Sequence, residues 1–496
     1  LAENPNIVNP TLNNTGPFRW WIYESLLDNK SIDRFTTELA MMEGSLRYGG
    51  PAGFAMASEN DAPMAAKAHI LASAFMAMDL RCARCHDAPY HPFKQEDLFS
   101  LAALLGRGPL EVPKTSTIPA GIKSELVTVT LKPGQKIAPK WPFESSQQLS
   151  LDFALKPGDS REEFAFRLTS PHNPRFAQVI VNRLWRRYLG RGLVEPVDDF
   201  DRSVNAHPQL LDFLARELVL HDYDLKHVTR LILNSQLYQR MPTSDVELIK
   251  ALAAPLRRRM SAEQIVDSLF VAAGKQFHVE ELNIDVDSGR SEMSSINLGL
   301  PTRAWQFTSM SNERDRPALS LPASQTIVNV LEAFGWRGSR QDPVTIREQE
   351  PTVLQPAILA NGVVGKRITQ LSEDSYFTEF SLGDQPLESL VSGLYQQILS
   401  RPPSSVEREI IAVILADGYE NRRTGSSPGI RPGPYKRDGV AWSNHLKPES
   451  SDIKIRFAKE VEKGDPPTTR LTADWRERAE DMVWALVNSP EFVWIP

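Results

Sequence analysis

The two cysteines of this chain stand beside a histidine in one short polar stretch, LRCARCHDAPYHPF, at residues 80–93. Two residues separate Cys82 from Cys85, and His86 follows directly. This C-x-x-C-H order is the sequence form of c-type haem attachment, in which two thiols add across the haem vinyl groups and the adjacent imidazole reaches the iron. The spacing therefore predicts one covalent haem c, with Cys82 and Cys85 as thioether anchors and His86 as the proximal iron ligand.

Three other interpretations of the cysteine pair stay open. A buried pair of free cysteines in an apolar helix needs no ligand, although the flanking Arg81 and Arg84 speak against such a helix. A zinc site could use Cys82, Cys85 and His91, but no second pair of ligands lies nearby. A thioredoxin-like redox pair would need a surrounding βαβ pattern, which the sequence lacks. Haem attachment is the favoured interpretation.

The distal side of the iron is less defined. Small electron-transfer cytochromes usually take a distal Met from further along the chain, but no methionine occurs between Met78 and Met241. The candidates near the motif are His91, His69 and Met56. His91 follows so closely that the chain has little length to pass from one haem face to the other. A ligand from the later domain or from a separate piece of protein is an alternative, as is an open position that would bind peroxide or other small ligands.

Other charged groups could support a ligand. Arg81 and Arg84 are expected to pair with the haem propionates, with simple solvation as the alternative. Residues 198–201, DDFD, could bind calcium but lack the spaced ligands of a calcium loop. His207 precedes Pro208 and is expected to be a helix-entry residue. The other later histidines, which carry no assigned role, are His172, His221, His227, His278 and His445. The chain has no P-loop, G-x-G-x-x-G, G-x-S-x-G or H-E-x-x-H motif.

Length and composition set the broad class. A chain of 496 residues can form two to four domains, and 41% hydrophobic and 24% charged residues are typical of globular proteins. The net charge is −6 and there is no basic tail, so the charge pattern does not indicate nucleic acid as a partner. No apolar run is long enough for a transmembrane helix. The sequence starts LAENP, so we expect a processed or truncated chain whose signal lay upstream, since covalent haem attachment takes place outside the cytoplasm.

Hydrophobic periodicity predicts a mainly α protein with long loops. Helices are expected on both sides of the motif, at 63–81 and 98–105, and a small β insert is expected at 109–160 with a strand at 124–131. A helical domain is expected from 161 to the end, with residues 420–470 as a long exposed excursion. The further helices that we expect are 18–27, 31–42, 175–189, 209–220, 225–235, 261–273, 325–334, 354–371, 387–399, 405–417 and 474–488.

Several stretches resemble a known family pair. They are CARCHD at 82–87, HPF at 91–93, NPRFAQVIVNRLW at 173–185, GRGLV at 190–194, HPQLLD at 207–212, LILNS at 231–235, RRRMSAE at 257–263, EPTVLQ at 350–355, LSRPP at 399–403 and ALVNSPEF at 485–492. The first two resemble a planctomycete-type cytochrome c domain, and the others resemble the planctomycete-specific domain that follows it. The resemblance implies residues 1–108 as the C-terminal part of the cytochrome domain and 161–496 as the planctomycete-specific helical domain.

The chain departs from that family in two places. The first half of the cytochrome domain is absent, and we expect it to be a cleaved N-terminal chain of the same precursor that helps to enclose the haem. Ala88 stands where many members have a histidine, and His91-Pro-Phe lies three positions later.

These observations favour a periplasmic or cell-envelope c-type cytochrome that passes electrons to a redox partner protein. One alternative is a haem-dependent oxidoreductase, a dehydrogenase or peroxidase-like enzyme, whose large second domain binds a carbohydrate or other small substrate. Another is an envelope assembly protein with a structural haem.

Overall fold

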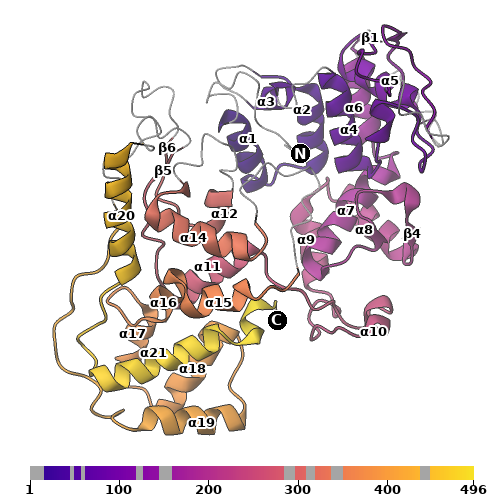
Figure 1. Ribbon diagram of the computed structural model, residues 1–496. Coiled ribbons are helices and arrows are strands. Elements are labelled where there is room, and N and C mark those ends of the chain that lie inside the picture. Colours follow the sequence, from indigo (N-terminus) through magenta and orange to yellow (C-terminus); the bar gives the residue numbers. More distant parts are fainter. Residues whose placement is uncertain are drawn as a thin grey trace. The chain divides into compact units, whose positions relative to one another are not determined.

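A computed structural model describes residues 16–44, 50–56, 62–118, 127–143, 159–283, 297–308, 319–336, 350–435 and 447–495. Helices make up 55% of it and strands 4%, so the expectation of a mainly α fold is confirmed. The chain forms two compact units, residues 1–256 and 257–496 (Figure 1). This boundary lies inside the stretch 161–496 that we expected to form one domain. Residues 160–256 therefore pack with the C-x-x-C-H segment.

The described part of the first unit consists of short helices and two small pairs of antiparallel strands. Its helices are α1 (Gly16–Leu27), α2 (Ile32–Met41), α3 (Ala52–Met56), α4 (Pro63–Met76), α5 (Gln95–Leu105), α6 (Ser160–Thr169), α7 (Pro174–Leu189), α8 (Pro208–Leu220), α9 (Leu225–Leu233) and α10 (Val246–Lys250), with 3₁₀ turns at Cys82–Arg84 and Phe200–Arg202. Helices α4 and α5 pack on each other, as do α7 and α8. One continuous hydrophobic core joins these helices.

Helix α4 ends earlier than its hydrophobic pattern predicts. The pattern suggests a helix to residue 81, but Ala77 adopts a left-handed conformation with φ 48° and its N–H donates to the carbonyl of Ala72. Such a residue closes a helix by satisfying one of its last carbonyls. The chain therefore enters the cysteine motif through five non-helical residues.

The β structure of residues 109–160 is smaller than expected. It consists of β1 (Leu110–Glu111) paired antiparallel with β2 (Lys136–Ile137). The expected strand at 124–131 is wrong for its described part, since residues 127–131 form no ladder, and the rest of it lies outside the described residues. The N–H groups of Thr130 and Leu131 instead donate to the side chain of Gln95 in α5, which takes the place of a strand partner.

The second unit is again built from helices. They are α11 (Ala262–Ala273), α12 (Ala304–Thr308), α14 (Pro322–Ala333), α15 (Leu354–Asn361), α16 (Val363–Thr369), α17 (Tyr376–Ser381), α18 (Leu387–Leu399), α19 (Ser405–Ala416), α20 (Pro448–Lys463) and α21 (Ala473–Val487). Strands β5 (Leu282–Asn283) and β6 (Asn297–Gly299) pair in this unit, as β3 (Val194–Glu195) and β4 (Val204–Asn205) do in the first. A separate hydrophobic core, with fully buried Trp475, holds the helices together.

Two helical expectations for this unit are wrong in detail. The single helix expected at 354–371 is divided at Gly362, whose extended backbone with ψ 158° ends α15 and begins α16. The excursion expected at 420–470 contains the helix α20. By contrast, the helix expected from residue 261 is present as α11, and Ser261 caps it by accepting a hydrogen bond from the N–H of Gln264, whose side chain bonds back in a capping box.

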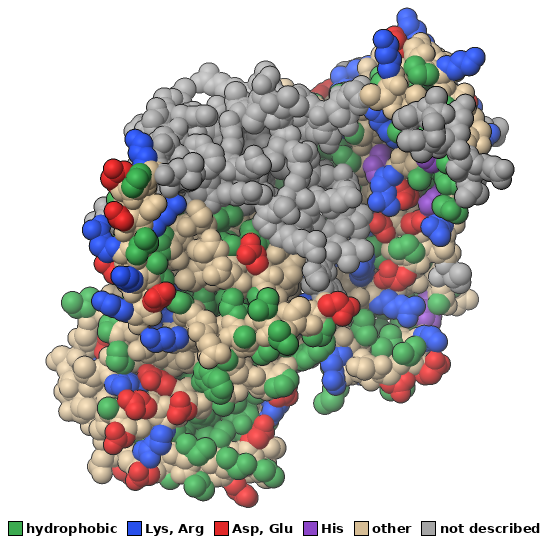
Figure 2. All heavy atoms as spheres, in the orientation of Figure 1, with side chains coloured by type: hydrophobic (Ala, Val, Ile, Leu, Met, Phe, Trp, Pro, Cys, Tyr) green, Lys and Arg blue, Asp and Glu red, His purple; other side chains and the backbone are tan. Residues whose placement is uncertain are grey.

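One face of helix α19 in the second unit is apolar and exposed to solvent. The exposed large hydrophobic residues on α19 are Val406, Ile410, Val413 and Ile414. They recur at helical spacing and so share one side of the helix. Figure 2 shows hydrophobic side chains gathered at the lower end of this unit, where Figure 1 places α19. None of the described helices is both long and apolar enough to span a membrane.

Candidate functional site

The segment that leads into the cysteines is anchored by a distant arginine. Arg175, at the start of α7, donates from Nε to the carbonyl of Met76 at 2.5 Å and from Nη2 to that of Ala77 at 3.2 Å. The N–H of Phe200 also donates to Ala77, at 2.9 Å. These bonds satisfy the last carbonyls of α4, which a helix end leaves without partners. The entry to the motif is therefore fixed by residues about a hundred positions away.

The cysteines and the histidine lie on one tight turn. The carbonyl of Cys82 accepts hydrogen bonds from the N–H groups of Cys85 at 3.2 Å and His86 at 3.1 Å. Ala83 points into the core and is fully buried, whereas Cys82 and Cys85 are half-buried free thiols. Burial raises the pKa of the Cys82 thiol, and the nearby Asp79 carboxylate adds to this effect. Cys82 is therefore a neutral thiol at neutral pH.

His86 is oriented by the backbone that follows it. Its Nδ1 lies 2.7 Å from the carbonyl oxygen of Asp87. Since a carbonyl only accepts, Nδ1 carries the proton and Nε2 keeps its lone pair. No described residue bonds to Nε2. This pattern, in which one imidazole nitrogen is fixed by a carbonyl, is how proteins set the ring of a metal-binding histidine.

A network of hydrogen bonds holds the residues after the turn. The N–H of Asp87 donates to the carbonyl of Thr128 at 2.8 Å, and its Oδ1 accepts from Thr130 Oγ1 at 2.7 Å and from the N–H of Gln95 at 2.9 Å. The fully buried Gln95 accepts from the N–H groups of Thr130 and Leu131 at 2.9 and 3.1 Å. The turn is thereby bound to residues 127–131 without using either thiol or His86 Nε2.

Both arginines of the motif have protein partners. Arg81 forms a two-pronged ion pair with Asp79, with Nη2 and Oδ2 2.7 Å apart. Arg84 donates to the hydroxyl of Ser116. Arg81 remains the more exposed of the two, with 58% of its side chain open to solvent. Their pairing with propionates stays a prediction.

The structure places the distal candidates in different settings. His91 Nε2 lies 2.8 Å from Asp199 Oδ2, and only 7% of its side chain is exposed. Ligation through Nε2 would break this bond, so the geometry favours a structural role for His91. His69 is half-buried on α4 and lies near Asp79; burial raises the pKa of that carboxyl, but hydrogen bonds from Arg81 lower it further, and His69 adds a smaller lowering effect. Met56 ends α3, and its side chain lies outside the described residues.

Zinc binding at the cysteines fits the structure poorly. Zinc needs ligand atoms that converge on one point. Among the described residues, one group of three His, Cys, Asp or Glu side chains converges within 4.8 Å, and it contains neither cysteine but Glu217, His221 and His227. Attachment of haem c does not require the two thiols and the imidazole to converge on one point.

Several residues around the turn carry contacts that their sequence positions do not predict. Asp79, Ser116 and Gln95 were given no role, and Asp199 was considered only for calcium. Asp199 instead bonds His91, and Asp201 pairs with Arg175 at 2.6 Å. The capping pattern of Lys94 and Asp97 marks the start of α5 and could have drawn attention to Gln95. No local pattern connects His91 to a residue 108 positions later.

Two family models match the chain. One, PSD1, a protein of unknown function (DUF1553), matches residues 160–415, and the other, PSCyt2, a protein of unknown function (DUF1549), matches residues 3–108. The chain belongs to the PSD1 family. This pair of domains is typical of planctomycete proteins. Searches of curated proteins and of solved structures found no match.

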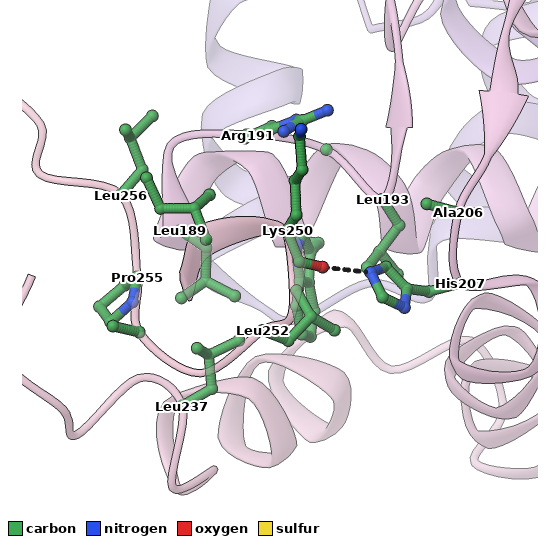
Figure 3. A pocket seen from close by; sticks show the side chains of 14 residues that line it. Leu189, Arg191, Leu193, Ala206, His207, Leu237, Lys250, Leu252, Pro255 and Leu256 are labelled. Atoms are coloured by element: carbon green, nitrogen blue, oxygen red, sulfur yellow. Dashed lines mark hydrogen bonds between the residues drawn. The ribbon is translucent and has the colours of Figure 1, made fainter. Parts of the chain in front are cut away.

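The PSD1 region of the first unit contains an apolar pocket (Figure 3). Its walls include Leu189, Leu193, Leu237, Leu252, Pro255 and Leu256, with Arg191 and His207 among the polar residues that line it. His207 Nε2 donates to the carbonyl of Lys250 at 3.0 Å, the bond drawn in Figure 3. His207 also stands at the N-cap of α8, as expected, but its side chain makes no capping bond. The pocket can hold a small apolar group against leucines.

The second unit has a buried ionic network. Lys275, with a fully buried side chain, donates to the carbonyl of Arg367 and to Ser372 Oγ, both at 2.7 Å, and to Asp465 Oδ2 at 3.1 Å. Burial lowers the pKa of Lys275, and the charges of Asp465 and Asp374 oppose this. An ammonium group has three N–H donors, so three acceptors saturate it. This network has a structural role in the PSD1 fold.

Proposed function

We propose that this chain is a c-type cytochrome of the cell envelope or periplasm, with one haem bound covalently through Cys82 and Cys85 and His86 as proximal ligand. One observation carries the proposal. The three donors lie on a single turn whose backbone is fixed by other residues, while both thiols are unlinked and His86 Nε2 keeps its lone pair. A redox partner protein is part of the proposal.

The chain's own residues define the chemistry of this site. When bound, the haem would supply a one-electron couple. Cys82 and Cys85 fix its position through thioether bonds, and the carbonyl of Asp87 aims the His86 ring. Arg81, which is paired with Asp79 and still half open to solvent, can present its guanidinium to an anionic propionate. The bonds of Gln95 and Asp87 to residues 127–131 hold the turn rigid, which keeps the reorganisation on electron transfer small.

Optical spectra of the chain matured in a periplasm test the electron-transfer role. We expect a low-spin haem that is reduced and reoxidised reversibly and does not react with carbon monoxide or peroxide. His86→Ala removes the proximal ligand but not the thioethers, so haem stays attached and becomes reactive to carbon monoxide. His91→Ala is the matched control, because His91 is held by Asp199, and its haem spectrum is expected to stay that of the unmodified chain. A wild-type haem that is high-spin and binds carbon monoxide contradicts electron transfer.

A haem-dependent oxidoreductase is the second candidate, supported by the pocket of Figure 3. Its lining favours an apolar substrate group over a carbohydrate, because ligand specificity comes from a few polar groups in an otherwise apolar wall and leucines dominate here. In this case a small substrate should reduce the haem, and Leu252→Trp, which fills the pocket, should abolish reduction while leaving the haem spectrum unchanged. Reduction that persists in this variant places the substrate elsewhere.

A further inference from the structure

The end of α8 and the start of α9 bring two imidazoles and a carboxylate together. Glu217 Oε2 lies 3.0 Å from His227 Nε2 and 3.5 Å from His221 Nδ1. The two imidazole rings stack with centroids 3.5 Å apart and planes 14° from parallel. One ligand atom from each of the three side chains lies within 4.8 Å of the others.

Local structure explains this convergence. Glu217 and His221 are four residues apart on the last turn of α8 and therefore share one face. Asp222 and Tyr223 then adopt positive φ angles of 52° and 57°, which reverse the chain, and the buried Tyr223 ring anchors the reversal. His227 follows in the first turn of α9. The backbone thus holds the three groups together independently of the C-x-x-C-H turn.

The donor chemistry is that of a metal site. His221 Nδ1 is the ring nitrogen near the carboxylate, 3.5 Å from Glu217 Oε2, and it also lies 3.0 Å from the carbonyl of Glu217. A metal ion that binds Nδ1 would replace the hydrogen bond to this carbonyl. Imidazole and carboxylate form the ligand set that zinc and similar divalent cations accept, and sites with two histidines and one glutamate leave a position for water. The nearby Asp224 is already engaged, because its carboxylate caps α9 through the N–H of Lys226 and accepts from Asn29 Nδ2.

We propose that Glu217, His221 and His227 bind one divalent transition-metal ion, with zinc as the preferred cation. Solvent reaches the site, since 47% of the His221 side chain is exposed while Glu217 and His227 are half-buried at 23% each. Water therefore fills the remaining coordination positions. The site is separate from the haem proposal and does not depend on it.

Cobalt(II), a spectroscopic substitute for zinc, tests this site in the full chain without a polyhistidine tag. A Cys82→Ser/Cys85→Ser background removes thiolate ligands. We expect one cobalt per chain, with visible bands of nitrogen and oxygen ligands and no thiolate charge-transfer band, and displacement by zinc. His221→Ala and Glu217→Gln should each weaken binding by at least about tenfold. The matched control is His172→Ala, an exposed histidine of the same unit outside the cluster, which should bind cobalt like the parent.

His221 is exposed, so its removal leaves the core intact, and an unchanged circular dichroism melt verifies folding. The proposal is overturned if the parent shows no saturable cobalt binding, or if binding is equal in the His221→Ala, Glu217→Gln and parent chains. Cobalt binding that occurs only when the cysteines are restored also overturns it.

Discussion

The Cys82–His86 turn and the Lys275 network are both polar groups set among helices. They differ in whether their side-chain donor and acceptor atoms are already used by other residues. On the turn, the backbone is bonded throughout, but both thiols are unlinked and His86 Nε2 keeps its lone pair. In the network, the Lys275 ammonium has three acceptors and is fully buried. A buried charge is tolerated only when it is paired and hydrogen-bonded. We infer that the network serves the fold and that the turn is built for a ligand.

Replacing Lys275 should give the largest loss of stability. Lys275→Met removes the buried ammonium beside Asp465 and Asp374 and leaves Arg367 as the basic partner of Asp465, and breaking such a buried pair costs about 3–5 kcal/mol. Urea unfolding of the full chain, with hydrogen exchange to follow the second unit, measures this cost. Lys366→Met is the control, because Lys366 is exposed and surface changes stay within about 0.5 kcal/mol. Equal stability of the Lys275→Met and Lys366→Met variants would show that the Lys275 network does not stabilise the fold.

The scaffold of the turn should show a smaller but clear effect. Gln95→Leu leaves the N–H groups of Thr130 and Leu131 without their acceptor, which costs about 1–3 kcal/mol for buried donors. Hydrogen exchange should accelerate at residues 127–131 and at the turn itself. Glu96→Leu, at the exposed neighbouring position, should leave exchange there unchanged. Unchanged exchange in Gln95→Leu would mean that the turn does not depend on this network.

The ion pair of Arg401 and Glu407 should have the smallest effect on stability, and this effect should depend on pH. The side-chain hydrogen bonds from Arg401 lower the pKa of Glu407 from 4.5 to about 2, against the smaller opposing effect of burial. Because the folded pKa is depressed, the pair stabilises the protein above about pH 4.5 and loses this contribution as the pH falls toward 2. Solvent screening limits the contribution to about 1 kcal/mol.

Arg401→Ala should therefore differ from the parent by this amount at pH 6 and converge with it near pH 2, as measured by urea unfolding at each pH. A constant difference between the two chains across this range would show that the Glu407 pKa is not shifted by Arg401.

Local patterns predicted the parts of the site that depend on adjacent residues. The C-x-x-C-H spacing marked Cys82, Cys85 and His86, and helices were expected before and after them, as the structure shows with α4 and α5. The helix expected to end at residue 189 does end there, with Gly190 as its C-cap at φ 80°. These features follow from periodicity and from the conformational freedom of glycine, which act over a few residues.

Long-range partners could not be predicted in the same way. The left-handed Ala77 that ends α4 is a residue with high helix propensity, and the carbonyls that it leaves are satisfied by Arg175 from another helix. His91 was considered as an iron ligand, but Asp199 supplies a partner that no spacing rule indicates. The grouping of Glu217, His221 and His227 likewise depends on the chain reversal at Asp222 and Tyr223. Their positive φ angles could not be predicted from the local sequence.

The covalent bond between haem and the turn tests the central claim most directly. The chain is matured in a periplasm that has c-type haem attachment, denatured, and examined by intact-mass and peptide mass spectrometry. We expect one haem per chain, retained after unfolding and located on the peptide with Cys82 and Cys85, and none in Cys82→Ala/Cys85→Ala. Haem that is released by denaturation, or a wild-type chain that carries no haem while both thiols stay free, would contradict the account.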